Sequence, residues 1–211
     1  MDGVLLDTEP IYTEVTHRIT SRYGKVFDWS VKSDMLGRAA MDSAEYLVGR
    51  LGLPIDPEDY LRERTPMLEA LLADAKAIPG AESFTRDLHR RGIAIAVATS
   101  TDERLFGVKT RAHRDWFSIF RSVVCGDDPR VTSGKPAPDI FLAAAADLGV
   151  APETCVVVED SPLGVAAAVA AGMRVVGFPD PRMDRARFAA ADFVVGSYEE
   201  LRRLDLGLEE V

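Results

Sequence analysis

The sequence predicts an α/β protein in which helices cover both faces of a parallel sheet, with an all-helical segment inserted near its start. Three features support this prediction. From residue 78 onward, short apolar runs alternate with segments of helical composition, which is the order that builds a parallel sheet. Residues 10–77 show only helical spacing of their apolar residues. Polar clusters directly follow several apolar runs, at the strand ends where α/β proteins bind ligands.

The composition is that of an ordinary globular protein, with 47% hydrophobic and 28% charged residues. The net charge of −9 argues against nucleic-acid and membrane-surface partners, which need a basic face. It leaves room for a small anionic substrate. No apolar run reaches the roughly 18 residues that span a bilayer, and the N-terminus lacks the pattern of a signal peptide. We therefore expect a cytoplasmic protein and take a monomer as the default.

The chain opens on what resembles the end of a strand that runs into a glycine turn, over residues 1–9. Helical apolar stripes follow, and glycines such as Gly24 and Gly52 end the first two of them. The segment 10–77 is predicted to contain no strand. We therefore divide the chain into a core of residues 1–9 and 78–211 and an inserted helical domain of residues 10–77.

The core contains several short apolar runs that are typical of buried strands. A segment of helical composition precedes each run. The tail at residues 204–211 is expected to be loosely packed. The strand-like runs are residues 93–98, 123–124, 156–158, 175–176 and 193–195.

Two adjacent acids, Glu159 and Asp160, end one of these apolar runs. Adjacent carboxylates at a strand end are costly unless a cation or a bound proton offsets their repulsion. Mg²⁺ suits such a site, because it prefers carboxylate oxygens and keeps its own waters. The alternative is that Glu159 is solvated and that Asp160 caps the helix beginning near Pro162.

Polar residues after two other runs could bind an anion. Thr99 and Ser100 place hydroxyl and backbone N–H groups at a strand end, although Thr99 taken alone is more often the residue of a local turn or a helix cap. Lys135 lies between Gly134 and Pro136 in a stiff loop, from which it could reach a phosphate and neutralise nearby acids. A solvated surface lysine is the alternative.

Two acids, Asp2 and Asp7, flank the first apolar residues of the chain. An aspartate at a strand end can act as a general acid and base. Short acidic side chains in loops are more often simple turn residues. Taken one at a time, these candidate positions leave both interpretations open.

The order of the segments is more specific than any one of them. Asp-Gly-Val-Leu-Leu-Asp-Thr-Glu comes first, then a strand ending in Thr99, then Gly-Lys-Pro at residues 134–136, then a strand ending in Glu-Asp-Ser at residues 159–161. This order resembles the four motifs of the haloacid dehalogenase superfamily. The resemblance implies a Rossmann-like parallel sheet core, and the helical segment is similar to the small α-helical cap of that superfamily.

The resemblance implies roles for the start of the chain. The superfamily's first motif reads Asp-Met-Asp-Gly, and residues 1–3 match its last three letters. Asp2 would then be the catalytic acid and base. The first Asp, the nucleophile that becomes an aspartyl-phosphate, would lie immediately before Met1 and is absent from this sequence. We expect the native protein to extend upstream of Met1, and the chain as it stands to be nearly inactive.

The other motifs carry the remaining implied roles. Thr99, Ser100 and Lys135 would bind the transferred phosphoryl group. Mg²⁺ would be held by Glu159 and Asp160, with help from the backbone carbonyl of Asp2. The implied activity is Mg²⁺-dependent hydrolysis of a small phosphorylated metabolite.

Several further segments resemble pseudouridine-5′-phosphatases, and related glycerol-3-phosphate phosphatases share nearly all of them. We therefore expect pseudouridine 5′-phosphate as the substrate, with glycerol 3-phosphate as the alternative. Arg38 is the candidate cap contact with substrate, unless it is simply a surface arginine. A non-catalytic phosphate-binding protein and a phosphosugar mutase are further alternatives. The segments are residues 27–30, 35–38, 93–100, 113–114, 126–129 and 134–139.

Overall fold

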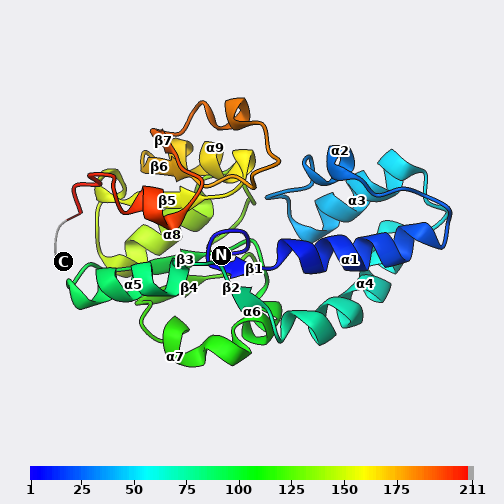
Figure 1. Ribbon diagram of the computed structural model, residues 1–211, viewed down its shortest axis with the longest axis horizontal. Helices are drawn as coiled ribbons and strands as arrows, with labels where there is room; N and C mark the ends of the chain where they lie inside the picture. The colour runs from blue at the N-terminus through cyan, green and yellow to red at the C-terminus, as the bar shows by residue number, and fades with distance from the viewer. Residues whose placement is uncertain (209–211) are drawn as a thin grey trace.

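The computed structural model describes residues 1–208 of the chain (Figure 1). The strands are β1 (Leu6–Asp7), β2 (Lys76–Ala77), β3 (Ala96–Ala98), β4 (Ser122–Val124), β5 (Val156–Glu159), β6 (Arg174–Gly177) and β7 (Phe193–Val194). The helices are α1 (Glu9–Ser21), α2 (Trp29–Lys32), α3 (Ala40–Leu51), α4 (Pro57–Leu72), α5 (Ala81–Arg90), α6 (Glu103–Lys109), α7 (Arg114–Phe117), α8 (Asp139–Leu148), α9 (Pro162–Ala170) and α10 (Tyr198–Leu201). Short 3₁₀ helices are η1 (Arg111–His113), η2 (Pro152–Thr154) and η3 (Arg185–Phe188).

The core strands form two parallel sheets that are not hydrogen-bonded to each other within residues 1–208. One sheet pairs β3 with β4, and the other has the order β5-β6-β7. The predicted α/β class with parallel strands is confirmed. The apolar run at residues 93–98 is shorter as a strand than as a sequence pattern, because ladder pairing with β4 begins only at Ala96.

Helices cover both faces of these strands, as predicted. Val97 packs on one face with Leu88 of α5 and with Trp116. On the other face, Ala96 and Ala98 pack with helices α8 and α9. Successive residues of one strand thus enter opposite layers, as the pleat of a strand requires.

Helices α1 to α4 pack around an apolar cluster of their own and lie to one side of the strands (Figure 1). Val15 and Ile19 of α1 meet Leu47 of α3 and Tyr60 and Leu68 of α4 in this cluster, and all five are buried. This geometry suits a separate helical unit. The boundaries at residues 10 and 77 stay a prediction.

Two features differ from the expectations. The segment 10–77 ends in the short strand β2, which pairs antiparallel with β1, because the two chain connections between the helices and the core run side by side. A two-residue strand has too few residues to show a periodicity. The tail is not loose throughout: Leu206 is only 8% exposed and packs in the core, while residues 209–211 lie outside the described residues.

Candidate active site

A cavity of about 270 Å³ lies where the carboxyl ends of β3 and β5 meet helices α1 to α4. Its core side includes Asp2, Thr99 and Lys135, and its helical side includes Tyr12 and Arg64. The crevice at the carboxyl ends of parallel strands is the usual ligand position in α/β folds. The structure therefore brings most of the sequence-predicted site residues around one space, Ser100, Glu159 and Asp160 among them.

The Asp2 carboxylate is fixed by donors from three segments. Thr8 donates to its Oδ1 at 2.6 Å, Lys109 Nζ lies 2.7 Å from the same oxygen, and Thr101 donates to Oδ2 at 3.1 Å. Burial alone would raise the pKa of Asp2, but the positive charges of Lys109 and the chain's α-ammonium outweigh it and lower the pKa to about 2. Asp2 is therefore a carboxylate at neutral pH, and its 23% exposed side chain faces the cavity.

Lys109 is a residue of this site that sequence reasoning missed. Its side chain is 0% exposed, donates to Asp2 and to Thr101, and lies 5.1 Å from the centre of the Tyr12 ring. Lys109 ends α6, where a lysine ordinarily points to solvent. The available signal was its spacing of four residues from Leu105, which places both side chains on one helix face.

Lys135 and Glu159 form a buried ion pair. Lys135 Nζ lies 2.8 Å from Glu159 Oε2, and the two side chains are 5% and 6% exposed. The other carboxylate oxygen accepts from the Ser161 hydroxyl at 2.8 Å. Burial would raise the pKa of Glu159, but Lys135 and the α-ammonium overcome this and lower it. Both Glu159 oxygens are thus engaged, and Lys135 is held at the cavity wall.

Asp160 is in the opposite electrostatic state. Burial first, then the neighbouring charges of Glu159 and Glu9, raise the pKa of Asp160 well above its usual value. The first loop closes tightly over this carboxylate: Gly3 has φ +67°, and a Cβ there would lie 2.2 Å from Asp160 Oδ2. A side chain at residue 3 is therefore excluded by both backbone conformation and space.

These residues fit a Mg²⁺ ion. A cation beside Asp160 would offset the repulsion that raises its pKa, and carboxylate and carbonyl oxygens are the ligands Mg²⁺ prefers. Within residues 1–208, no group of three His, Cys, Asp or Glu side chains surrounds a common point. This agrees with the habit of Mg²⁺ to use one or two carboxylates and to fill its shell with water and substrate oxygens. Asp160, Glu159 and the Asp2 carbonyl stay the predicted ligands.

Thr99 and Ser100 lie at the cavity as predicted, but Thr99 also makes the local turn that was the alternative. Its Oγ1 accepts from the backbone N–H of Thr101 at 3.2 Å. The two interpretations are compatible, because a hydroxyl that accepts one bond can still donate its own proton. Asp7 is exposed in β1 and does not take part in this cavity within the described chain.

The predicted cap contact, Arg38, lines the cavity but is exposed. Its Nε donates to the Asp34 carbonyl at 2.6 Å, and its guanidinium lies 5.0 Å from the centre of the Tyr46 ring. A second arginine of the helical segment, Arg64, was missed by sequence reasoning. It is only 9% exposed and lies against the Tyr12 and Tyr60 rings.

Arg64 carries an unsatisfied donor. Its Nε is buried and has no hydrogen-bond partner within residues 1–208. Leaving a buried charged donor unpaired costs free energy, so this group suits an anionic or polar part of a ligand in the cavity. Only the tertiary structure shows that Arg64 is buried at the cavity. In the sequence it is one of several charged residues of α4 and has no feature that distinguishes it from them.

Comparisons with known proteins agree with this geometry. A family model described as haloacid dehalogenase-like hydrolase matches residues 1–172. The chain belongs to this family, and the predicted resemblance is confirmed. No helix in residues 1–208 is long and apolar enough to cross a membrane.

Individual relatives are similar along nearly the whole chain. The chain is 46% identical over 99% of its length to (DL)-glycerol-3-phosphatase 1, mitochondrial, of Arabidopsis thaliana, covering 72% of that protein. It is 41% identical over 99% of its length to a probable pseudouridine-5′-phosphatase of Drosophila melanogaster, covering 91% of it. The crystal structure of CbbY from Rhodobacter sphaeroides in complex with phosphate matches with a TM-score of 0.76 and 29% identity, over 95% of this chain and 93% of that one. The predicted enzyme class, a phosphatase, is confirmed.

Proposed function

We propose that the protein is a Mg²⁺-dependent phosphomonoester hydrolase for a small phosphorylated metabolite, with pseudouridine 5′-phosphate as the first candidate. The observation that carries this proposal is the convergence on one cavity of an oriented carboxylate, Asp2, a buried lysine, Lys135, and an electrostatically strained acid, Asp160. Catalysis of phosphoryl transfer is mainly positioning and charge stabilisation, and these groups can supply both.

In this proposal each residue has one task. Asp2 acts as the acid in its protonated form and gives its proton to the leaving oxygen; the resulting carboxylate, oriented by Thr8 and Lys109 and favoured by the low pKa, then takes a proton from the attacking water and is protonated again. Thr99, Ser100 and Lys135 bind the oxygens of the phosphoryl group. Asp160 and Glu159, with the Asp2 carbonyl, hold Mg²⁺, which when bound reduces the repulsion between the phosphate and the surrounding carboxylates. The resemblance adds an aspartate nucleophile before Met1.

Glycerol 3-phosphate is the second candidate substrate. Two observations favour it. The relative that is 46% identical is named a glycerol-3-phosphatase. The cavity of about 270 Å³ is also slightly smaller than the ~300–1,000 Å³ of pockets for drug-sized ligands. A small polyol phosphate could place its phosphate at Lys135 and its hydroxyls near Arg64.

The test is Mg²⁺-dependent phosphate release from pseudouridine 5′-phosphate, uridine 5′-phosphate and glycerol 3-phosphate. Two chains are compared: the sequence as given, and the same sequence with an Asp placed before Met1. We expect release only from the second, with loss of activity in Asp2→Asn. Preference for glycerol 3-phosphate would keep the mechanism and change the substrate.

A second hypothesis is a protein that binds phosphorylated ligands without hydrolysing them. Tight binding of a phosphomonoester together with no phosphate release from either chain would favour it over the hydrolase.

A further inference from the structure

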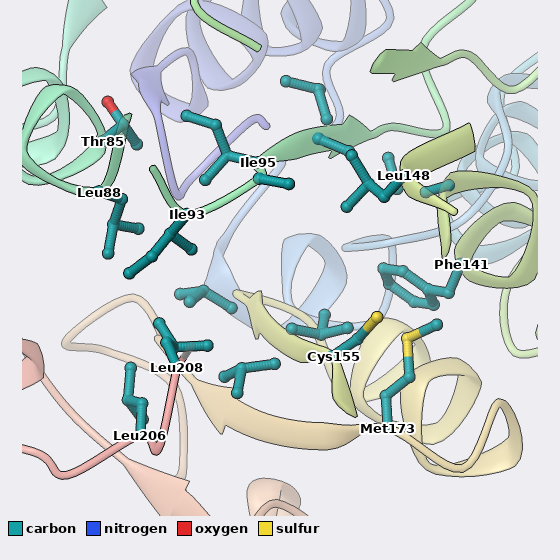
Figure 2. Close-up of a pocket in the computed structure, with 18 of the residues that line it drawn as sticks. Thr85, Leu88, Ile93, Ile95, Phe141, Leu148, Cys155, Met173, Leu206 and Leu208 are labelled. Carbon is teal, nitrogen blue, oxygen red and sulfur yellow. The ribbon is translucent and has the colours of Figure 1, made fainter. Parts of the chain in front are cut away.

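The described chain contains ligand-sized space beside β3 and β5 as well as in the candidate active site. The first space, of about 550 Å³, is lined by apolar side chains, among them Ile95, Leu148 and Met173 (Figure 2). The candidate active site differs, because charged side chains line it from the core and from the helices. One of these, Arg38, is exposed, so its position depends on the few contacts that hold it.

Arg38 belongs to a closed ring of three residues. Its Nε donates to the Asp34 carbonyl at 2.6 Å, and its guanidinium lies 5.0 Å from the centre of the Tyr46 ring. The Tyr46 hydroxyl in turn donates to Asp34 Oδ2 at 3.0 Å. A shift of Asp34 would therefore move both supports of the arginine. Because Nε makes the bond to the carbonyl, the two Nη groups can still bind an anion.

The other carboxylate oxygen of Asp34 is bound from the core. Arg187 Nη1 lies 3.3 Å from Asp34 Oδ1 and donates to the Ser33 carbonyl, also at 3.3 Å. Arg187 lies in η3, where the next residue, Phe188, is 0% exposed and packs in the core. The turn that carries Arg187 is thus anchored, and the arginine fixes two consecutive residues of the helical segment.

A second arginine of the same core loop holds the start of α2. The Arg182 guanidinium lies 4.3 Å from the centre of the Trp29 ring, within the range of a cation–π contact. Its plane is fixed by Asp180, whose two carboxylate oxygens accept from Nε at 3.0 Å and from Nη2 at 2.8 Å. The loop after β6 accordingly reaches toward α2 in Figure 1. We call Arg182 and Arg187 the arginine pair.

The chain between the arginine pair and Arg38 lies directly on the core. Leu36 packs against the core cluster, and a Cβ at Gly37 would lie 2.4 Å from Ser161 Oγ. The contact of Arg187 with Asp34 adds little to overall stability, because the two side chains are 38% and 45% exposed. Its effect is therefore mainly on where the following residues lie.

We propose that the arginine pair positions Arg38 for ligand binding, by holding the segment before it on the core so that the guanidinium is ordered at the cavity in advance. The pair itself does not touch the ligand. A side chain that is ordered before binding avoids an entropic cost worth roughly 2- to 10-fold in affinity. This inference rests on the proposed function, because it takes the cavity to bind a phosphorylated ligand.

The first experiment follows Arg38 in the ligand-free chain by NMR. The Nε–H signal, assigned by its loss in Arg38→Lys, reports on the bond to the Asp34 carbonyl. We expect its exchange with water to be about two- to fivefold faster in Arg182→Met and in Arg187→Met. Arg185→Met is the matched control, because Arg185 is an exposed arginine of η3 that donates to the Val194 carbonyl. Unchanged exchange in both test variants overturns the proposal.

The second experiment measures binding of glycerol 3-phosphate and of inorganic phosphate by calorimetry. We expect Arg187→Met to weaken binding of glycerol 3-phosphate by roughly 2- to 10-fold, and to have no further effect when Arg38→Met is also present. Equal weakening with and without Arg38 contradicts the proposal, since the charge of Arg187 would then act by another route.

The two experiments separate this proposal from the proposed function. Failure of the unsubstituted chain to bind either phosphate compound would overturn the proposed function, and with it the ligand-binding role of Arg38. The exchange result needs neither ligand nor activity, and it decides whether the arginine pair orders Arg38.

Discussion

Lys109 is a buried cation whose partner is the proposed acid and base. Removing one partner of a buried ion pair leaves the other uncompensated and costs about 3 kcal/mol or more. We therefore expect Lys109→Met to lower the free energy of unfolding by about 3 kcal/mol, measured by urea denaturation.

The double variant with Asp2→Asn tests whether this cost reflects the pair. The second substitution should recover part of the loss, because it removes the charge that Lys109→Met leaves unpaired. If the two substitutions were simply additive, Lys109 would not be acting through Asp2.

Arg64 offers a buried donor to the candidate active site. We expect Arg64→Met to weaken binding of a phosphomonoester by about 10- to 100-fold, the usual worth of a hydrogen bond to a charged group, measured by calorimetry. In the ligand-free protein the substitution should cost little, since the Nε has no partner to lose.

Arg62, on the same helix, provides the matched control. Its side chain is 76% exposed and pairs with Asp59, so Arg62→Met should leave binding unchanged. Equal effects of the two variants would show that only general positive charge matters.

At the scale of elements, the end of β5 places Asp160 beside Glu159. The raised pKa of Asp160 means that the folded state binds a proton more tightly than the unfolded state. Asp160 therefore contributes fully to the free energy of unfolding when the pH is below its pKa in the unfolded chain, near 3.8. This contribution is lost as the pH rises through the pKa of Asp160 in the folded protein. At pH 8 without Mg²⁺ we expect Asp160→Asn to raise Tm.

Mg²⁺ should increase the free energy of unfolding of the unsubstituted protein at pH 8 by up to about 2.7 kcal/mol at a hundredfold excess over Kd. Its Tm should rise accordingly. The Asp160→Asn variant should lose this increment. A full Mg²⁺ effect in the variant would place the ion elsewhere.

The loop after α2 docks the helical segment onto the start of α9. Gly37 has φ +80°, and a Cβ there would lie 2.4 Å from Ser161 Oγ, which caps α9 by accepting from Gly164 N. Gly24 has φ +66° but nothing within 4 Å of an added Cβ. Gly24→Ala should cost about 1–2 kcal/mol from backbone strain, and Gly37→Ala about 1–3 kcal/mol more from the close contact. Similar losses in thermal unfolding would mean that the loop moves away freely.

The same elements show what the sequence could predict. The apolar runs located β3 to β7, because a buried strand leaves a local pattern. Strand β2 could not be found, since its two residues exist as a strand only through pairing with β1. At the site, Glu159, Asp160 and Lys135 were predictable from their positions after apolar runs. Lys109 and Arg64 were not predicted: the spacing of Lys109 from Leu105 indicates a helix face only, and nothing local to either residue shows which partner it will meet.

At the scale of the whole molecule, the division of the core strands into two sheets has a consequence for cooperativity. The strands β3 and β4 share α8 as a packing partner, while β5 and β6 share α9. Each half of the core thus carries its own hydrogen-bonded ladder and its own covering helix. Within residues 1–208 no strand ladder joins the halves, so they are coupled through side-chain packing and loops.

Proteins open in contiguous cooperative units, so the two halves should open separately. Native-state hydrogen exchange should give β3–β4 amides and β5–β6 amides free energies of opening that differ by more than about 1 kcal/mol. One common value for both groups would contradict this. The two apolar clusters contain residues of both halves and would still couple these openings, so heating would broaden the unfolding transition without dividing it in two.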